Sequence, residues 1–208
     1  MPEPPRSPEP PRDDLPSRVV LGAEALAALA VPARLAILNH ILAVGPCTAS
    51  ECAPVVGESA SNCSWHLRAL EKVGLVERAL RSEGDGRTRP WRATAVGYQF
   101  AEEADEAPAE RIARTALVGL VAEHANDLYR RYLELRNALP GDWAKASGDF
   151  GYALDLTPEE LTSLLERIDA LIRPYVPPIR PDPPEGSRVV QVTLRAFPNP
   201  HLLGDLGA

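Results

Sequence analysis

The chain has 208 residues, 45% of them hydrophobic, which is enough to bury the core of one or two compact domains. No stretch approaches about 18 uninterrupted apolar residues, and the N-terminus lacks a basic segment followed by an apolar one, which argues against a membrane span and a secretory signal. The net charge of −7 argues at first against nucleic acid, but residues 18–98 hold nine basic and seven acidic side chains, whereas residues 99–208 hold eleven and eighteen. Because local charge governs contact with phosphates, the middle segment stays compatible with nucleic acid. The lack of a membrane span and of a secretory signal favours a cytoplasmic protein.

Residues 1–17 are rich in proline and nearly without apolar side chains, so we expect a disordered tail, either inert or able to bind a partner. From Val19 the pattern turns helical, because apolar side chains recur at helical spacing as far as Leu42. Pro32 stands where a second helix begins, and the Gly45-Pro46 pair ends it.

Two further helices and a hairpin complete an N-terminal domain over residues 18–98. Thr48 and Glu51 form a capping-box pattern, which predicts a short helix to about residue 56. Ser59 is a favoured N-cap for the next helix, which ends at Gly74. The stretches 75–81 and 89–94 then read as short strands joined by a segment rich in turn formers.

The helix that Ser59 starts has two contrasting faces on a helical wheel. Cys63, Leu67 and Leu70 share the predicted core side. The opposite side carries Ser61, Asn62, Ser64, Trp65, Arg68 and Lys72. Arg and Asn can read guanine and adenine edges in a major groove, and Arg68 and Lys72 can instead hold phosphates. The alternative is an ordinary solvated face. Against it, Trp65 is poorly placed in water unless it packs on a neighbouring element.

The predicted hairpin tip is basic and contains two glycines, Gly84 and Gly86, that allow a tight loop close to a partner. We expect contacts to the DNA backbone or minor groove from Arg81, Arg87, Thr88 and Arg89. A plain exposed loop with arginines for solubility is the alternative, and Glu83 and Asp85 partly favour it. Helix, turn, reading helix and hairpin together predict a winged helix-turn-helix.

Four stretches carry a family resemblance: ALAVPARLAILNHIL, TASECAPVVG, SNCSWHLRALEKVGLVER and GRTRPWRATAVG. The most specific is the S-x-H-L-x-x-L-x-x-x-G-L-V run from Ser64 to Val76. Through them, residues 22–98 resemble ArsR-type winged helix-turn-helix transcriptional regulators. The resemblance implies a homodimer that binds operator DNA, usually as a repressor. It also maps Ser61, Asn62, Ser64, Trp65 and Arg68 onto the recognition helix, with His66 and Leu67 as its characteristic pair, and matches Arg34 to an arginine near the start of the second helix. We predict that Ser59 and His66 contact DNA together with these residues.

Metal chemistry finds little support in the sequence. Metal-sensing members of that family often carry a Cys-x-Cys pair before the recognition helix, where this chain has Cys52 alone. The spacing of Cys47, Cys52 and Cys63 matches no standard zinc pattern, so buried reduced thiols are favoured over a thiolate site. We predict no metal and no cofactor. The catalytic signatures G-x-S-x-G, P-loop and strand-linked G-x-G-x-x-G are missing too, so we predict no enzymatic activity.

A long helix is predicted over residues 108–139, with an apolar stripe that is too long for a small monomer core to cover. The stripe is the predicted homodimer interface and comprises Leu117, Val121, His124, Leu128, Tyr132 and Leu135. His124 lies near Glu123 and Asp127, so it is either an interface histidine or a metal ligand across a dimer. Two-fold symmetry would then call for an inverted-repeat operator.

Residues 140–208 are predicted to form a strand, a helix and a strand, which makes the fold class mainly α with a small C-terminal α/β unit. The expected strands are 149–156 and 188–197, and Thr157 and Glu160 cap the helix between them. The aromatic residues of this unit are either a pocket for an organic or protein effector or plain packing that stiffens the dimer: Trp143, Phe150, Tyr152, Tyr175 and Phe197. A protein-interaction module that uses a winged-helix scaffold without binding DNA remains the alternative function.

Overall fold

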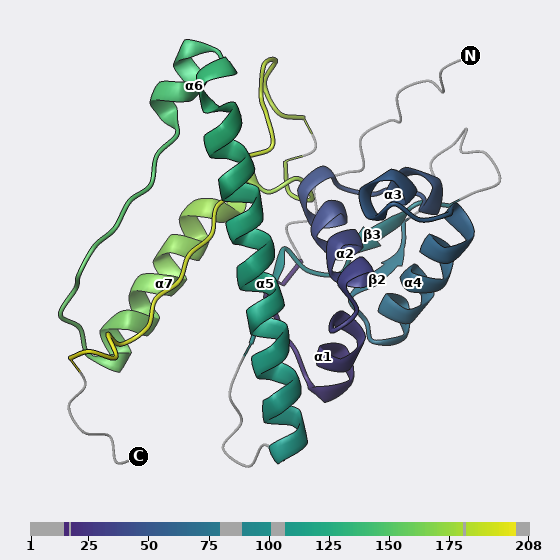
Figure 1. Ribbon diagram of the computed structural model, residues 1–208, viewed down its shortest axis with the longest axis horizontal. Helices are drawn as coiled ribbons and strands as arrows, with labels where there is room; N and C mark the ends of the chain where they lie inside the picture. The colour runs from purple at the N-terminus through teal and green to yellow at the C-terminus, as the bar shows by residue number, and fades with distance from the viewer. Residues whose placement is uncertain (1–14, 17, 80–88, 101–106, 181, 203–208) are drawn as a thin grey trace.

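The computed structural model describes residues 15–16, 18–79, 89–100, 107–180 and 182–202. The fold is mainly helical, with two small two-stranded sheets. In Figure 1 a long helix, α5 (Pro108–Leu135), stands between a head of four shorter helices with the sheets and a second part. That second part contains α6 (Gly141–Ala146) and α7 (Pro158–Ile172). The predicted mainly α class is therefore confirmed.

The head contains α1 (Ala23–Leu29), α2 (Pro32–Val44), α3 (Ala49–Val56) and α4 (Ala60–Lys72). Their ends follow local rules that the sequence already displays. Thr48 and Glu51 cap α3 reciprocally, as predicted, and Ser59 accepts a hydrogen bond from the backbone N–H of Asn62 at the start of α4. Gly57, which separates these two helices, has a φ of 68°, a left-handed conformation that favours glycine.

The predicted hairpin strands are confirmed as β2 (Val76–Arg78) and β3 (Trp91–Ala93), which pair antiparallel. In this register Glu77 lies opposite Arg92, and the Arg92 Nε donates to the Glu77 carboxylate at 3.0 Å. Residues 80–88, which hold most of the predicted hairpin tip, lie outside the described residues.

The expectation of helix from Val19 onward is wrong at its start. Residues Arg18–Val20 form β1, which pairs in parallel with β4 (Gly97–Gln99), and the first helix begins only at Ala23. β4 itself was not predicted. Local periodicity cannot reveal such a strand, because its backbone partner lies far away in the chain.

The predicted tail ends earlier than expected. Leu15 is buried, with 4% of its surface exposed, and its carbonyl accepts a hydrogen bond from the Arg173 guanidinium at 2.5 Å. The Pro16 carbonyl accepts another from the backbone N–H of Val96. These two residues therefore belong to the folded protein, while residues 1–14 and 17 lie outside the described ones.

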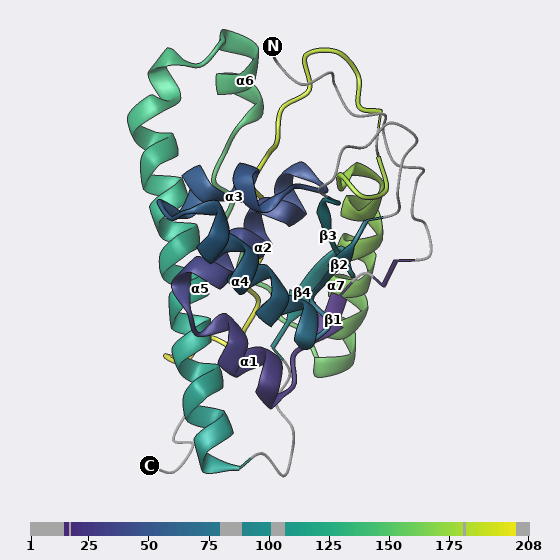
Figure 2. The same ribbon diagram turned by 90° about the vertical axis from the view of Figure 1, so that its right-hand side faces the viewer.

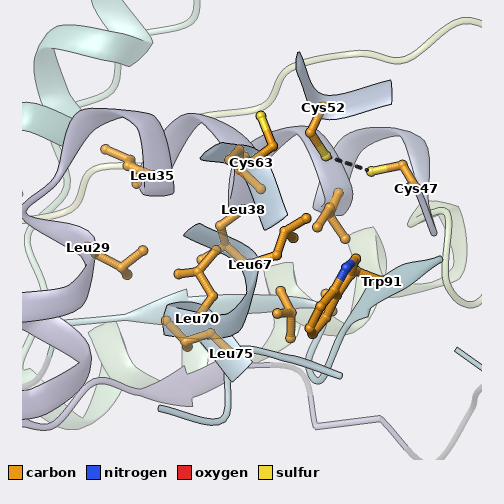
Figure 3. Close-up of a cluster of buried hydrophobic side chains, with 14 of the residues drawn as sticks. Leu29, Leu35, Leu38, Cys47, Cys52, Cys63, Leu67, Leu70, Leu75 and Trp91 are labelled. Atoms are coloured by element: carbon orange, nitrogen blue, oxygen red, sulfur yellow. Dashed lines mark hydrogen bonds between the residues drawn. The ribbon is translucent and has the colours of Figure 1, made fainter. Parts of the chain in front are cut away.

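The core lies mainly within the head, where it joins all four helices to the sheet of β2 and β3, and it includes Leu117 of α5. Trp91 is its largest side chain and is 2% exposed. Figure 3 shows Leu29 and Leu35 at one end of this cluster and Trp91 at the other, with leucines of α2 and α4 between them. The buried aliphatic members with no more than 2% of their surface exposed are Leu29, Ile37, Leu38, Ile41, Leu67, Leu70, Val76 and Leu117.

Helix α5 (Pro108–Leu135) continues as a 3₁₀ turn over Arg136–Ala138, so the α-helix ends slightly before the predicted residue 139. Leu117 is fully buried and packs with the head, which α5 meets mainly through α1. The prediction that Leu117 belongs to a dimer stripe is therefore wrong, because its own chain already covers it. Val121 is partly buried against the same core.

The helix α6 (Gly141–Ala146) was not predicted, whereas α7 (Pro158–Ile172) begins with the predicted Thr157 capping box and is followed by a 3₁₀ turn over Arg173–Tyr175. α7 lies beside the β1–β4 sheet in Figure 2, where Arg18 of β1 forms an ion pair with Asp169 at 2.9 Å.

The two strands predicted in residues 140–208 are wrong. Residues 149–156 and 188–197 are extended, yet neither stretch belongs to a strand in the described part of the chain. Every residue of both stretches is exposed, including the apolar Tyr152 and Val190, so the alternating sequence pattern has no buried side here. A β-ladder needs a second backbone at hydrogen-bonding distance, which the pattern itself cannot supply.

No single helix among the described residues combines the length and hydropathy of a membrane span, and α1 and α2 reach that combination only as a pair bent by 98°. Both helices contribute buried side chains to the head, including Leu29 and Ile37.

Candidate nucleic-acid interface

The reading face predicted from the sequence lies on α4, and the core side of that helix fixes its orientation. Cys63, Leu67 and Leu70 are all fully buried, as the wheel predicted. α4 packs closely against α3, and Gly74, with a φ of 73°, turns the chain from α4 into β2. The opposite side of α4 is thereby held outward on a rigid support.

The outward side of α4 is accessible along its length. Ser64 is half-buried, and the exposed members of the predicted set are Ser61, Asn62, Trp65, Arg68 and Lys72. Trp65 is 58% exposed, which excludes the alternative that it is buried against a neighbouring element of its own chain. An indole held in water at the centre of a polar face offers a flat surface that a partner can cover.

Trp65 has one neighbour that sequence reasoning did not foresee. The Arg34 guanidinium, from α2, lies over the indole with its central carbon 4.9 Å from the ring centroid, a cation–π geometry. The same guanidinium donates a hydrogen bond to the Ala28 carbonyl at 3.1 Å, and this bond fixes its position beside the indole. Arg34 therefore steadies the indole and adds a positive charge beside the outward face. The sequence offered only a family match for this arginine, with no signal for its contact.

His66 does not lie on the outward face, and its prediction as a DNA contact is corrected. It is 7% exposed, and its Nε2 lies 3.1 Å from a carboxylate oxygen of Glu58. The imidazole also meets the edge of Trp65, with ring centroids 5.1 Å apart. His66 thus supports the reading helix from within instead of touching a ligand.

Positive charge continues from α4 onto the hairpin. Arg78 of β2 stacks over the Trp91 ring at 3.7 Å and donates to the Arg89 carbonyl at 2.6 Å. Burial lowers the pKa of Arg78; the nearby charges of Arg68 and Arg89 act in the same direction, while Glu71 opposes them. A group of like charges on a surface raises the local concentration of anions. Arg68, Arg78 and Arg89 therefore form a basic cluster that joins the reading helix to the hairpin.

Of the predicted hairpin-tip residues, only Arg89 is described. Its side chain donates to the Ala79 carbonyl at 3.0 Å, so part of this guanidinium holds the hairpin together. Arg81, Arg87 and Thr88 lie outside the described residues. Ser59 acts through its hydroxyl as the cap of α4, which places it at the N-terminal end of the outward face.

Two helices joined by a tight turn, followed by an antiparallel hairpin, define the head as a winged helix-turn-helix domain. Comparison with protein families agrees: residues 29–79 match the family described as "Helix-turn-helix domain". The matched segment runs from the end of α1 to the end of β2 and includes the whole of α3 and α4.

Other comparisons add little. No curated protein matches the chain. Among solved structures, one described as the crystal structure of a probable transcriptional regulator from Pseudomonas aeruginosa is 19% identical, and the match covers 72% of this chain and 88% of that one with a TM-score of 0.30.

Proposed function

We propose that the protein is a transcriptional regulator, acting as a repressor, that binds duplex DNA sequence-specifically through α4. The carrying observation is the outward face of that helix, which exposes amide, hydroxyl, indole and cationic groups beside the basic cluster of Arg68, Arg78 and Arg89. Arginine and asparagine are the side chains that read guanine and adenine in a major groove. We assign the finer class, ArsR-type, from the Ser64–Val76 motif, which spans most of α4 and the turn into β2.

Salt-dependent binding of the full-length protein to duplex DNA tests this proposal. Duplexes selected from a random pool by the protein would first define a preferred sequence. We then expect affinity to fall steeply as salt concentration rises, because each phosphate contact releases counterions. Absence of salt-dependent binding to any duplex would favour the alternative, a protein-interaction module. The surplus of acidic side chains in residues 99–208 and the apolar surface exposed there support that second function.

The wing prediction concerns Arg87 and Arg89. Arg87→Ala is expected to reduce the slope of log affinity against log salt by about one unit without changing the preferred sequence, as for the loss of one phosphate contact. Arg89→Ala should reduce the slope similarly and also loosen the hairpin, because Arg89 donates to the Ala79 carbonyl. Titrations at several salt concentrations provide the measurement. Unchanged slopes in both variants would place the wing off the DNA.

We further propose that the protein acts as a homodimer joined through α5 and binds an inverted repeat. Among the described positions from 107 to 202, Leu117 is the only buried residue. Large apolar side chains on α5 stay exposed, among them Leu128, Tyr129, Leu133 and Leu135. An apolar surface of this extent on one helix is typical of an interface. Leu117 and part of Val121 already pack against the head, so the apolar stripe left for a second protomer lies toward the C-terminal half of α5.

Leu128→Glu is expected to shift the protein from dimer to monomer at micromolar concentration, because it places a charge in an apolar interface. Sedimentation velocity of variant and wild type measures the change. Ile112→Glu is the matched control: Ile112 is 71% exposed and, sixteen residues earlier at ~100° per residue, lies roughly on the other side of α5. A monomeric wild type, or equal dissociation in both variants, would contradict this interface. His124, Tyr132 and Leu135 stay in the proposed set.

The predicted effector pocket is not formed by the aromatic side chains of residues 140–208. Phe150, Tyr152, Tyr175 and Phe197 are each between 68% and 81% exposed, so they wall no cavity within the single chain. Trp143, the fifth aromatic residue of this set, is half-buried, and the two strands expected to carry Phe150, Tyr152 and Phe197 are not formed.

A further inference from the structure

Two thiols meet at the start of α3. The Sγ atoms of Cys47 and Cys52 lie 3.3 Å apart in hydrogen-bonding contact, drawn as the dashed line in Figure 3, and both side chains are buried. Cys47 immediately precedes the N-cap Thr48, and Cys52 lies one turn into the helix. A pair of apolar side chains commonly packs at these two positions and fixes the entry of the chain into a helix. Such packing explains two small buried residues, but it does not call for two thiols in contact.

The backbone holds both thiols in place. Cys47 and Trp91 exchange two backbone hydrogen bonds, at 2.9 and 2.8 Å, which tie Cys47 to β3. The capping box fixes the first turn of α3: the Thr48 N–H donates to the Glu51 carboxylate at 2.6 Å and the Glu51 N–H donates back to the Thr48 hydroxyl at 3.3 Å. To form a disulfide of ~2.05 Å, the sulfurs need to close by only about 1.2 Å from their present separation.

The three cysteines of the chain differ in reactivity. The hydrogen bond from Cys47 lowers the pKa of the Cys52 thiol, and this outweighs burial and the charge of Glu51, which both act to raise it. Burial raises the pKa of Cys63, which has no dashed contact to the pair in Figure 3. Since the thiolate is the nucleophile, Cys52 is set to react first, while Cys63 is an internal control of similar burial.

We propose that Cys47 and Cys52 are a site of reversible oxidation, where a small peroxide converts the thiol pair into an intramolecular disulfide. The Cys52 thiolate attacks one oxygen of hydrogen peroxide, the O–O bond breaks, and the departing hydroxide takes up a proton to leave as water with a sulfenic acid on Cys52. The Cys47 thiol then attacks that sulfur, forms the S–S bond and releases a second water. Both thiols are oxidised and one peroxide is reduced to two waters, and a dithiol reductant reverses the change.

The bond would link Cys52 of α3 to Cys47, which immediately precedes the N-cap of that helix and is held to β3 by two backbone hydrogen bonds with Trp91. The disulfide would therefore fix the first turn of α3 covalently, while its connection to β3 stays a pair of hydrogen bonds. This inference depends on neither DNA binding nor dimerisation, because it rests on the contact between the two sulfurs and on the backbone that holds them.

Mapping of the linkage after treatment of the reduced full-length protein with hydrogen peroxide tests the proposal. Trypsin cannot separate the three cysteines, since all lie between Arg34 and Arg68 with no lysine or arginine in between. Cleavage after glutamate can, because Glu51 and Glu58 place each cysteine on its own peptide. After alkylation of remaining thiols, we expect peptides 25–51 and 52–58 joined through their cysteines, and peptide 59–71 alkylated at Cys63. Dithiothreitol should separate the joined pair.

The matched variants sharpen the result. Cys63→Ser should give the same linked peptides as the wild type, whereas Cys47→Ala and Cys52→Ala should give none. The wild-type measurement requires no substitution, so it decides the question even if a variant fails to fold. Alkylation of all three cysteines after peroxide, or a link that involves Cys63 or joins two chains, would overturn the proposal.

Discussion

Replacing Trp65 and Arg68 together by alanine is expected to abolish most of the preference of the protein for its selected duplex. Arg68→Ala alone should weaken specific binding by roughly 1–3 kcal/mol, about 5- to 150-fold, if Arg68 makes a bidentate contact with a base. Trp65→Ala removes the exposed indole and leaves the Arg34 guanidinium without its ring. Anisotropy titrations with the selected duplex and with a scrambled duplex measure both the affinity and the preference.

The control for this experiment is Arg167→Ala, which removes an exposed arginine from α7, on the far side of α5 from α4 in Figure 1. It loses the same charge without touching the reading helix, so specific affinity should change little. If the double variant of Trp65 and Arg68 binds the selected duplex as tightly as the wild type, α4 is not the reading helix. If Arg167→Ala weakens binding equally, net charge governs the effect and the base contact is disproved.

Trp91→Ala is expected to lower the free energy of unfolding by about 3–5 kcal/mol, as for other large aromatic residues removed from a packed core. The ring is 2% exposed and has the Arg78 guanidinium stacked on it at 3.7 Å, so truncation leaves both a cavity and an unstacked cation. A loss of this size is a large share of the total stability of an ordinary domain. Denaturant unfolding followed by circular dichroism measures it.

Trp65→Ala serves as the matched control, because it removes the same side chain from the surface of the same domain. Its indole is 58% exposed, so we expect only a small stability change, from the loss of its contacts with Arg34 and His66. The two variants should therefore differ in what they lose: Trp91→Ala should lower stability, and Trp65→Ala should lower DNA affinity. Equal losses of stability in the two variants would show that the head is packed differently from the arrangement described above.

The sequence predicted α3, α4 and the two faces of α4 well because the signals for them are local. The capping box of Thr48 and Glu51 and the N-cap Ser59 fall where α3 and α4 begin, and the spacing of Cys63, Leu67 and Leu70 identifies the buried side. Each of these signals depends on residues within about one or two helical turns of one another, which is the range over which helix rules operate. The exposure of Trp65 followed from the same wheel.

His66 and Arg34 show where such reasoning stops. His66 sits between the two faces of the wheel, and only its pairing with Glu58 decides that it points inward. Arg34 belongs to another helix, so its position over Trp65 depends on how α2 packs against α4. Neither contact leaves a trace in local periodicity.

By itself, the sequence determined α2, α3 and α4, the caps of α3 and α4, the hairpin strands and the composition of the outward face of α4, because hydrogen bonding and side-chain spacing within a few residues specify each of them. Tertiary structure alone decided the pairing of β1 with β4, the burial of Leu117 against the head and the contact of Cys47 with Cys52. In the first two cases the partner is remote in the sequence. In the third, the two thiols meet because β3 holds Cys47 in place. Segments 149–156 and 188–197 alternate in sequence like strands, yet they form none in the described part of the chain. An alternating pattern specifies which face of a strand would be apolar, but a strand forms only where a second backbone completes its hydrogen bonds.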